Sequence, residues 1–221
     1  MRDAGDKLKG QNGLTLFVYD RIKEMMLHYD IVPGQRLVFV DLAKQLNVSR
    51  TPVNNALCIL AKEGYLDFVP NQGYSVHRLT RKEARNLYEI REVLEVGTIG
   101  KAIRQTTDDK LEILKQRKLD YKNAVKDRVH RGLFILDTEF HAAIIEMIDN
   151  SKLAAHYRDV CQKIFLRFRV ENLRIKRIRE IVVEHEALYD AILIKDVERA
   201  KGLIRAHNEN AQRNLFALIF E

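Results

Sequence analysis

Residues 40–57 read Val-Asp-Leu-Ala-Lys-Gln-Leu-Asn-Val-Ser-Arg-Thr-Pro-Val-Asn-Asn-Ala-Leu, and this stretch decides the fold of the N-terminal part of the chain. Leu42, Ala43 and Leu46 place one apolar face on a short helix, which ends in a turn at Asn47. A second helix follows directly. Two short helices joined by such a turn are typical of a helix-turn-helix, a device that places its second helix in a DNA groove.

The second helix has a start signal, a buried face and an outward face. Ser49 is a natural N-cap, and Pro52 falls in the first turn, where a missing N–H costs little. The apolar positions repeat at the helical period and comprise Val53, Ala56, Leu57 and Leu60. The outward residues at the N-terminal end, where a recognition helix contacts bases, comprise Ser49, Arg50, Thr51, Asn54 and Asn55. We predict that these residues contact DNA.

A β-hairpin is predicted after this helix. Gly64 ends the helix, and residues 65–69 and 74–79 have the composition of two strands that pair around Asn71-Gln72-Gly73. This hairpin corresponds to the wing of a winged helix. We expect Gln72 and Gly73, at its tip, to contact DNA as well.

The remainder of the chain is predicted to be helical. Residues 15–29 form a helix before the motif, and Thr80-Arg81-Lys82-Glu83 is a capping box that begins a second domain. Helical periodicity then predicts six helices at about 81–105, 108–128, 131–148, 151–171, 175–194 and 197–219, with Asp108, Ser151 and Asp196 as caps of the second, fourth and sixth. We therefore predict a mainly α protein, with a winged helix-turn-helix in residues 1–79 and an all-α six-helix bundle in residues 80–221.

Four polar residues occupy positions in these helices where the pattern calls for apolar ones. Asp137 and His141 are i, i+4 neighbours on the inward stripe of the third helix, while His185 and His207 lie on the inward stripes of the fifth and sixth. Each histidine alone could be an ordinary core residue bonded to backbone. Together, four such groups are costly to bury without a shared partner, and a divalent metal (Zn, Ni, Mn or Fe) suits imidazole and carboxylate ligands.

Arg91 lies near the inward stripe of the first of these helices. A core-facing guanidinium needs an anionic partner, and a carboxylate pairs with it best. That partner could be internal, from Glu95 or Asp137, or it could be a bound organic acid.

Composition limits the remaining possibilities. The net charge is +7, but residues 1–78 hold only 10 Lys+Arg against 8 Asp+Glu, so the DNA prediction rests on the motif and not on charge. Two cysteines are too few for a disulfide framework, the N-terminal residues are polar, and no run of apolar residues is long enough to span a membrane. We expect a cytoplasmic protein without a membrane partner.

The first domain resembles the winged helix of the GntR family of bacterial regulators. The resemblance rests on Pro33-Gly34, Leu42-Ala43, Val48-Ser49-Arg50-Thr51-Pro52-Val53, Ala56-Leu57, Glu63-Gly64 and Gly73-Tyr74. The chain departs from the family pattern at Asn54-Asn55, where Arg-Glu is usual, and at Val40, where Arg is usual. Because Asn can read adenine as Arg reads guanine, we expect a shifted operator preference.

The second domain resembles the ligand-binding FCD domain that follows this winged helix in the FadR subfamily. The matching motifs are Arg91-Glu92-Val93-Leu94-Glu95, Asp137-Thr138-Glu139-Phe140-His141, Asn150-Ser151-Lys152-Leu153, Glu184-His185-Glu186-Ala187-Leu188 and His207. The resemblance implies that Asp137, His141, His185 and His207 are metal ligands. It also implies that Arg91 faces an effector.

The function that follows is a dimeric transcription regulator, expected to be a repressor. A homodimer would read an inverted repeat in a double-stranded operator, and a small carboxylate bound at the metal site would change operator affinity. Two alternatives stay open. One is a constitutive DNA-binding regulator with a purely structural metal, and the other is a metalloenzyme, since a metal with open positions can activate water.

Overall fold

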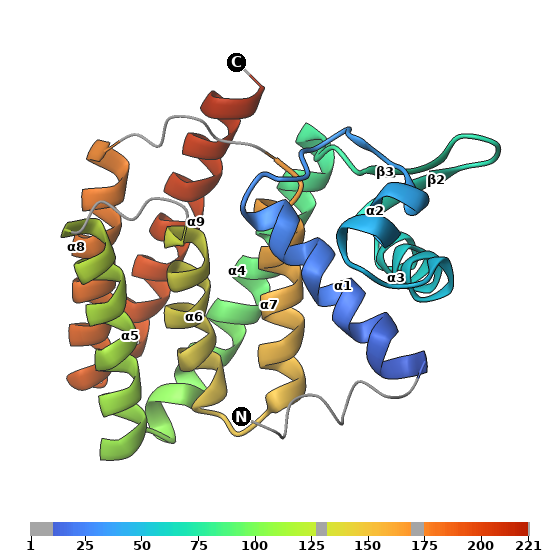
Figure 1. Cartoon of the computed structure of the whole chain (residues 1–221). Coiled ribbons are helices and arrows are strands. Elements are labelled where there is room, and N and C mark those ends of the chain that lie inside the picture. Colours follow the sequence, from blue (N-terminus) through green and yellow to red (C-terminus); the bar gives the residue numbers. More distant parts are fainter. Residues whose placement is uncertain (1–10, 127–131, 169–174, 221) are drawn as a thin grey trace. The chain divides into compact units, whose positions relative to one another are not determined.

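The computed structural model describes residues 11–126, 132–168 and 175–220, and its helices and strands fall into two compact units. The first unit comprises the chain up to Leu79 together with residues 165–168, and the second begins at Thr80. The predicted helix ends at residues 128, 131 and 171 lie outside the described residues. Figure 1 shows the elements of both units.

The first unit holds three helices and three short strands among its described residues. In chain order these are α1 (Gln11–Leu27), β1 (Arg36–Leu37), α2 (Phe39–Gln45), α3 (Arg50–Lys62), β2 (Leu66–Val69) and β3 (Gly73–Val76). The strands form one antiparallel sheet in the order β1-β3-β2. The structure confirms the helix-turn-helix and its wing, and it adds the third strand β1, which is too short to leave an alternating pattern in the sequence.

One apolar core holds this unit together. Its members include Val18 and Ile22 of α1, Leu57 of α3 and Val76 of β3, which are at most 1% exposed. Leu166, which follows the last residue of α7, is also buried in this core. The helical stripe predicted for α3 is therefore the face that packs inward.

Two backbone positions fix the ends of α2 and α3. Asn47 has φ 52°, a left-handed conformation that Asn tolerates better than most residues, and it turns the chain between the two helices. Gly64 has φ +83°, and the amide of Tyr65 donates to the carbonyl of Leu60, as at a glycine-terminated helix end. Ser49 lies at the N-cap of α3, but its side chain makes no capping hydrogen bond in the described structure.

Among the described residues, the second unit consists of six helices, which are labelled in Figure 1. They are α4 (Arg81–Arg104), α5 (Asp108–Lys126), α6 (Leu133–Glu146), α7 (Ser151–Phe165), α8 (Ile175–Leu193) and α9 (Val197–Ile219). α4 packs against α6 and α9, while α8 packs against α5 and α9. Their shared core includes Ile99, Phe140, Leu188 and Ile204. The mainly α fold with a six-helix second unit is confirmed.

The predicted helix caps are partly correct. Thr80 and Glu83 form the capping box at the start of α4, and Asp196 caps α9 by accepting from the amide of Arg199. The caps predicted at Asp108 and Ser151 are wrong by one residue. Thr107 accepts from the amide of Lys110, and Asn150 accepts from that of Leu153, because the capping side chain is the one immediately before the first helical residue.

None of the helices in the described ranges has both the length and the apolar composition that crossing a membrane would require.

Candidate DNA-contacting surface and metal centre

The side chains predicted to contact DNA lie on the solvent side of α3 and on the wing. Ser49, Arg50, Thr51, Asn54 and Asn55 are all exposed at the N-terminal half of this helix. Gln72, in the turn between β2 and β3, is exposed, and Gly73, the first residue of β3, is half-buried. Val40, a departure from the family pattern in the sequence, is half-buried on α2.

The wing is tied to the recognition helix through one polar contact. The hydroxyl oxygen of Tyr74 in β3 lies 2.8 Å from Sγ of Cys58 on α3. Burial is the largest cause that raises the pKa of Tyr74, to about 12, so this hydroxyl stays protonated at neutral pH and can donate. The contact fixes the wing beside the exposed face of α3.

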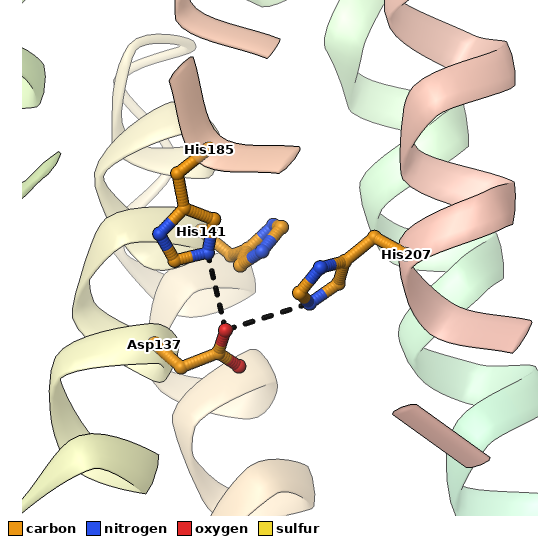
Figure 2. A group of neighbouring side chains, drawn as sticks. All are labelled: Asp137, His141, His185 and His207. Carbon is orange, nitrogen blue, oxygen red and sulfur yellow. Dashed lines mark hydrogen bonds and ion pairs between the residues drawn. The ribbon is translucent and has the colours of Figure 1, made fainter. Parts of the chain in front are cut away.

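Three helices of the second unit bring the candidate metal ligands together. Asp137 and His141 come from α6, His185 from α8 and His207 from α9, and Figure 2 shows their side chains converging. The three histidines are 1–2% exposed. One donor atom from each of the four residues lies within 4.8 Å of the others. Four side chains from three helices thus offer one nitrogen- and oxygen-rich site.

Asp137 is the centre of this cluster. Its Oδ1 lies 3.1 Å from Nε2 of His185 and 3.5 Å from Nε2 of His207 (Figure 2). Burial raises the pKa of Asp137, but the charge of His207 and the hydrogen bond from His185 outweigh it, so the pKa lies well below the ordinary value. Asp137 is therefore a carboxylate, which is the form that binds metal.

Two of the histidines each have a further carboxylate beside the ring. Glu95 Oε2 lies 2.7 Å from Nδ1 of His141, and Glu184 Oε2 lies 2.7 Å from Nδ1 of His207. Histidines that bind metals commonly donate their other ring N–H to a carboxylate, which fixes the ring and leaves the opposite nitrogen as the ligand. His207 and Glu184 form such a hydrogen bond, whereas His141 and Glu95 lie at ion-pair distance without the geometry of a hydrogen bond. In both rings a carboxylate lies beside Nδ1, which leaves Nε2 as the candidate ligand atom.

His185 is held differently. Its ring stacks on Phe140 with a centroid separation of 4.0 Å and meets the edge of Tyr121 at 5.0 Å. Its Nδ1 is buried without a hydrogen bond among the described residues. Burial lowers the pKa of His185 to about 4, so this imidazole is neutral and suited to ligation.

The buried nitrogens of the cluster fit a metal ion. Nε2 of His141 and Nε2 of His207 are buried and make no hydrogen bond in the described part of the chain. A buried polar atom without a hydrogen bond costs free energy, and a metal ion held by these nitrogens would supply the missing partner. Without a metal, burial lowers the pKa of His207, but the charges of Asp137 and Glu184 outweigh this effect and raise it to about 9. The cluster could therefore hold a divalent cation, with protons as its competitors.

Arg91 lies beside the cluster and is 5% exposed. Its Nε lies 3.4 Å from Glu95 Oε1, and its Nη2 lies 3.7 Å from Asp137 Oδ2 and donates to the Tyr157 hydroxyl at 3.0 Å. Both internal carboxylates considered from the sequence are thus near this guanidinium. Both separations are longer than the 2.7–2.9 Å typical of strong Arg–carboxylate bonds.

A cavity opens next to the cluster within the second unit. Its lining includes Arg91, Asp137 and His207, and the apolar side chains of Phe134, Ile181 and Leu215. Arg177 also lines the cavity, where it forms a two-pronged ion pair with Glu184 at 2.6 and 2.8 Å. Two of the four predicted ligand residues, Asp137 and His207, therefore border this cavity together with Arg91.

Three supporting residues were missed in the sequence reasoning as parts of the centre. Glu95 appeared there only as a possible partner of Arg91, and Glu184 only within a motif of the FCD resemblance. Arg177 belongs to a basic stretch for which the sequence predicts a solvated helix face, and this prediction is wrong because Arg177 is 7% exposed. Glu184 directly precedes His185 in the sequence, but its side chain contacts His207 on α9. Only the packing of α8 against α9 reveals this contact. The i, i+4 spacing from Arg91 was the one signal that pointed to Glu95.

Two protein families match the chain in succession. The family of bacterial regulatory proteins named gntR matches residues 14–76, and the FCD domain matches residues 86–210. The second match alone covers more than half of the chain and contains all four residues of the candidate metal centre.

Individual relatives agree with these families. The HTH-type transcriptional regulator YdhC of Bacillus subtilis is 27% identical over 91% of this chain and 90% of its own length. The HTH-type transcriptional repressor RspR of Escherichia coli is 23% identical over 89% of this chain and 81% of its own length. The solved structure of E. coli McbR/YncC matches with a TM-score of 0.81 at 23% identity, over 92% of this chain and 97% of that one, and shares the fold.

These matches set aside the metalloenzyme alternative, because the family consists of transcription regulators. The chain belongs to the GntR family of bacterial regulatory proteins, as a DNA-binding transcription regulator whose winged helix-turn-helix is followed by an FCD domain.

Proposed function

We propose that this regulator binds a divalent metal at Asp137, His141, His185 and His207, and that a small carboxylate bound beside the metal changes its operator affinity. The observation that carries this proposal is the convergence of the four side chains, with two buried Nε2 atoms that make no hydrogen bond, beside a cavity lined by Arg91, Asp137 and His207. A metal there would supply a Lewis-acidic centre for a carboxylate oxygen.

We propose that the metal is Zn, Ni, Mn or Fe. Three imidazoles and one carboxylate suit all four ions, and selection among them depends on affinity order and availability. With four protein ligands, a six-coordinate ion keeps two positions that water or an effector carboxylate could fill. Glu95 and Glu184 would hold the rings of His141 and His207 during exchange of that ligand.

Arg91 is proposed as the residue that pairs with the effector carboxylate. Its long separations from Glu95 and Asp137 leave its charge incompletely matched, and a guanidinium in this state favours a two-pronged bond to a carboxylate. The effector would then be held between the metal and Arg91. Tyr157 on α7 accepts a hydrogen bond from Arg91, so a movement of the Arg91 side chain would change this contact.

For DNA recognition, we infer that the exposed N-terminal residues of α3 read bases and the wing tip contacts the backbone. Asn54 and Asn55 favour adenine through its N6 and N7 atoms. A homodimer with two-fold symmetry would present two such helices to an inverted repeat. As a repressor acting on chromosomal operators, the protein would work in the cytoplasm.

The test is operator binding measured with and without the proposed ligands. An operator selected from a random duplex library, followed by fluorescence anisotropy with the metal-loaded and the chelated protein, gives the reference affinities. A panel of carboxylic acids should then change the affinity of the metal-loaded protein only. An effector can act only through different affinities for the DNA-competent and DNA-incompetent states, so a carboxylate that binds without changing operator affinity would contradict the proposal.

A constitutive regulator with a structural metal is the second candidate. The deep burial of all three histidines favours it, because metal binding can supply folding free energy. In that case, chelation would unfold the second unit, and no carboxylate would alter operator affinity.

A further inference from the structure

The two arginines that line the cavity differ in how they are paired. Arg177 is 7% exposed, and both of its terminal nitrogens bond to the two oxygens of Glu184, so its charge is matched. Arg91 has only long contacts to Glu95 and Asp137, of 3.4 and 3.7 Å. Of these two cations, Arg91 is the one with capacity for an additional anion.

The formal charges around the cluster leave room for one negative charge. Asp137, Glu95 and Glu184 are three carboxylates, and Arg91 and Arg177 are two cations, all largely buried in the described structure. These five groups carry one net negative charge. A divalent ion with neutral imidazole ligands would change the net charge of the site to one positive charge. One carboxylate balances that excess, and a second would leave a buried negative charge without a partner.

Among the described residues, no lysine or arginine lines the cavity besides Arg91 and Arg177. The rest of the lining is mostly apolar and includes Phe134, Ile178, Ile181, Leu215 and Leu218, while Tyr88, Tyr121 and Asn214 add neutral polar groups. These side chains can cover a hydrocarbon body but supply no cation for a second carboxylate. Burial of an unpaired charge is strongly unfavourable, whereas burial of apolar surface is favourable.

We propose that the effector is a monocarboxylic acid with an apolar body, and that the site rejects dicarboxylates of the same length. This inference rests on the function proposed above. The single carboxylate would lie between the metal and Arg91, and the hydrocarbon body would lie against Phe134, Leu215 and Leu218. Arg177 would stay engaged with Glu184 and would not act as a second anion receptor.

Binding of paired probes tests this selectivity. Saturated monocarboxylates and α,ω-dicarboxylates of matched chain length, with benzoate and terephthalate as a rigid pair, are titrated by calorimetry into the metal-loaded and the chelated protein. The monocarboxylates should bind with affinity that rises with chain length. Each matched dicarboxylate should bind roughly 100-fold more weakly, as expected for one buried unpaired charge.

A substitution in the apolar wall provides a gain-of-function test. Leu218 lines the cavity and is half-buried, so a longer side chain can reach the cavity from its position. Leu218→Arg should strengthen binding of a matched dicarboxylate and weaken that of the monocarboxylate. Leu218→Met keeps the wall apolar and should leave the selectivity unchanged.

The outcomes separate this inference from the function on which it rests. Metal-dependent binding that favours dicarboxylates, or that ignores chain length, would overturn the inference and leave a metal-and-carboxylate effector site standing. Absence of binding by every carboxylate would overturn both. Equal dicarboxylate binding by Leu218→Arg and Leu218→Met would show that the wall does not set selectivity and would also overturn the inference.

Discussion

The carboxylate of Glu95 lies 2.7 Å from Nδ1 of His141, and both side chains are at most 3% exposed. Burial raises the pKa of Glu95, but the interaction with His141 outweighs this effect and lowers it to about 2. A carboxylate with no access to water therefore fixes which nitrogen of His141 faces the metal centre. The same relationship recurs between Glu184 and His207, on a different pair of helices.

Replacing the carboxylate of Glu95 should weaken metal binding without removing a metal ligand. We expect Glu95→Gln to lower the metal affinity roughly 10–100-fold, because the amide cannot hold the ring of His141 as an ionised partner does. Competition with a chromogenic chelator measures the effect. Glu139→Gln is the matched control, since Glu139 lies on α6 with His141 but pairs with Arg158 at 2.8 Å. Equal losses in both variants would contradict the role given to Glu95.

Removing Arg91 should abolish most effector binding while the metal stays bound. We expect Arg91→Ala to lose roughly 10–100-fold in carboxylate affinity, the value of a hydrogen-bonded charge contact of about 1.5–3 kcal/mol. Calorimetry on the metal-loaded variant gives the affinity, and elemental analysis checks that metal content is unchanged. Arg158→Ala, which removes a guanidinium bonded to Glu139 and Glu146, serves as the control. Undiminished carboxylate affinity in Arg91→Ala would rule out the proposed role.

The base preference of the winged helix should follow Asn54. This residue is exposed on α3, so its substitution leaves the core intact. We expect Asn54→Arg to shift preference at one operator position from adenine toward guanine, by about 1–3 kcal/mol of discrimination. Selection from a randomised operator library with both proteins measures the shift. An unchanged preference would mean that Asn54 does not read a base.

Stability of the first unit should depend on the inward face of α3. Leu57 is 0% exposed in its core, and we expect Leu57→Ala to lower the free energy of unfolding by about 2–5 kcal/mol. Ile59, two residues along the same helix and 36% exposed, provides the control. Urea unfolding should show a change of no more than about 0.5 kcal/mol for Ile59→Ala. Similar losses in the two variants would contradict the assigned burial of α3.

The sequence was sufficient for the helix-turn-helix, the six helices of the second unit and the convergence of His141, His185 and His207. These features leave strong local patterns, because helical periodicity marks which residues face inward. The strand Arg36–Leu37 was missed because two residues are too few to alternate. Its pairing with β3 depends on a distant part of the chain.

The supporting shell of the centre could not be derived from periodicity. Glu95 and Glu184 reach histidines on other helices, so their roles depend on how α4 packs against α6 and α8 against α9. Likewise, the sequence identified Arg91 as a core-facing cation but could not distinguish it from Arg177. Only the distances to Glu184 show that one guanidinium is matched and the other is not.

The most direct test of the metal centre is the metal content per chain of the wild type and of His185→Ala, purified identically without an affinity tag. We predict about one divalent ion per wild-type chain and much less in the variant, because His185 supplies one of the four donors. No bound metal in either protein, even after incubation with Zn, Ni and Mn, would contradict the metal centre. The buried histidines would then be structural, and the effector site would have to be rebuilt around Arg91 alone.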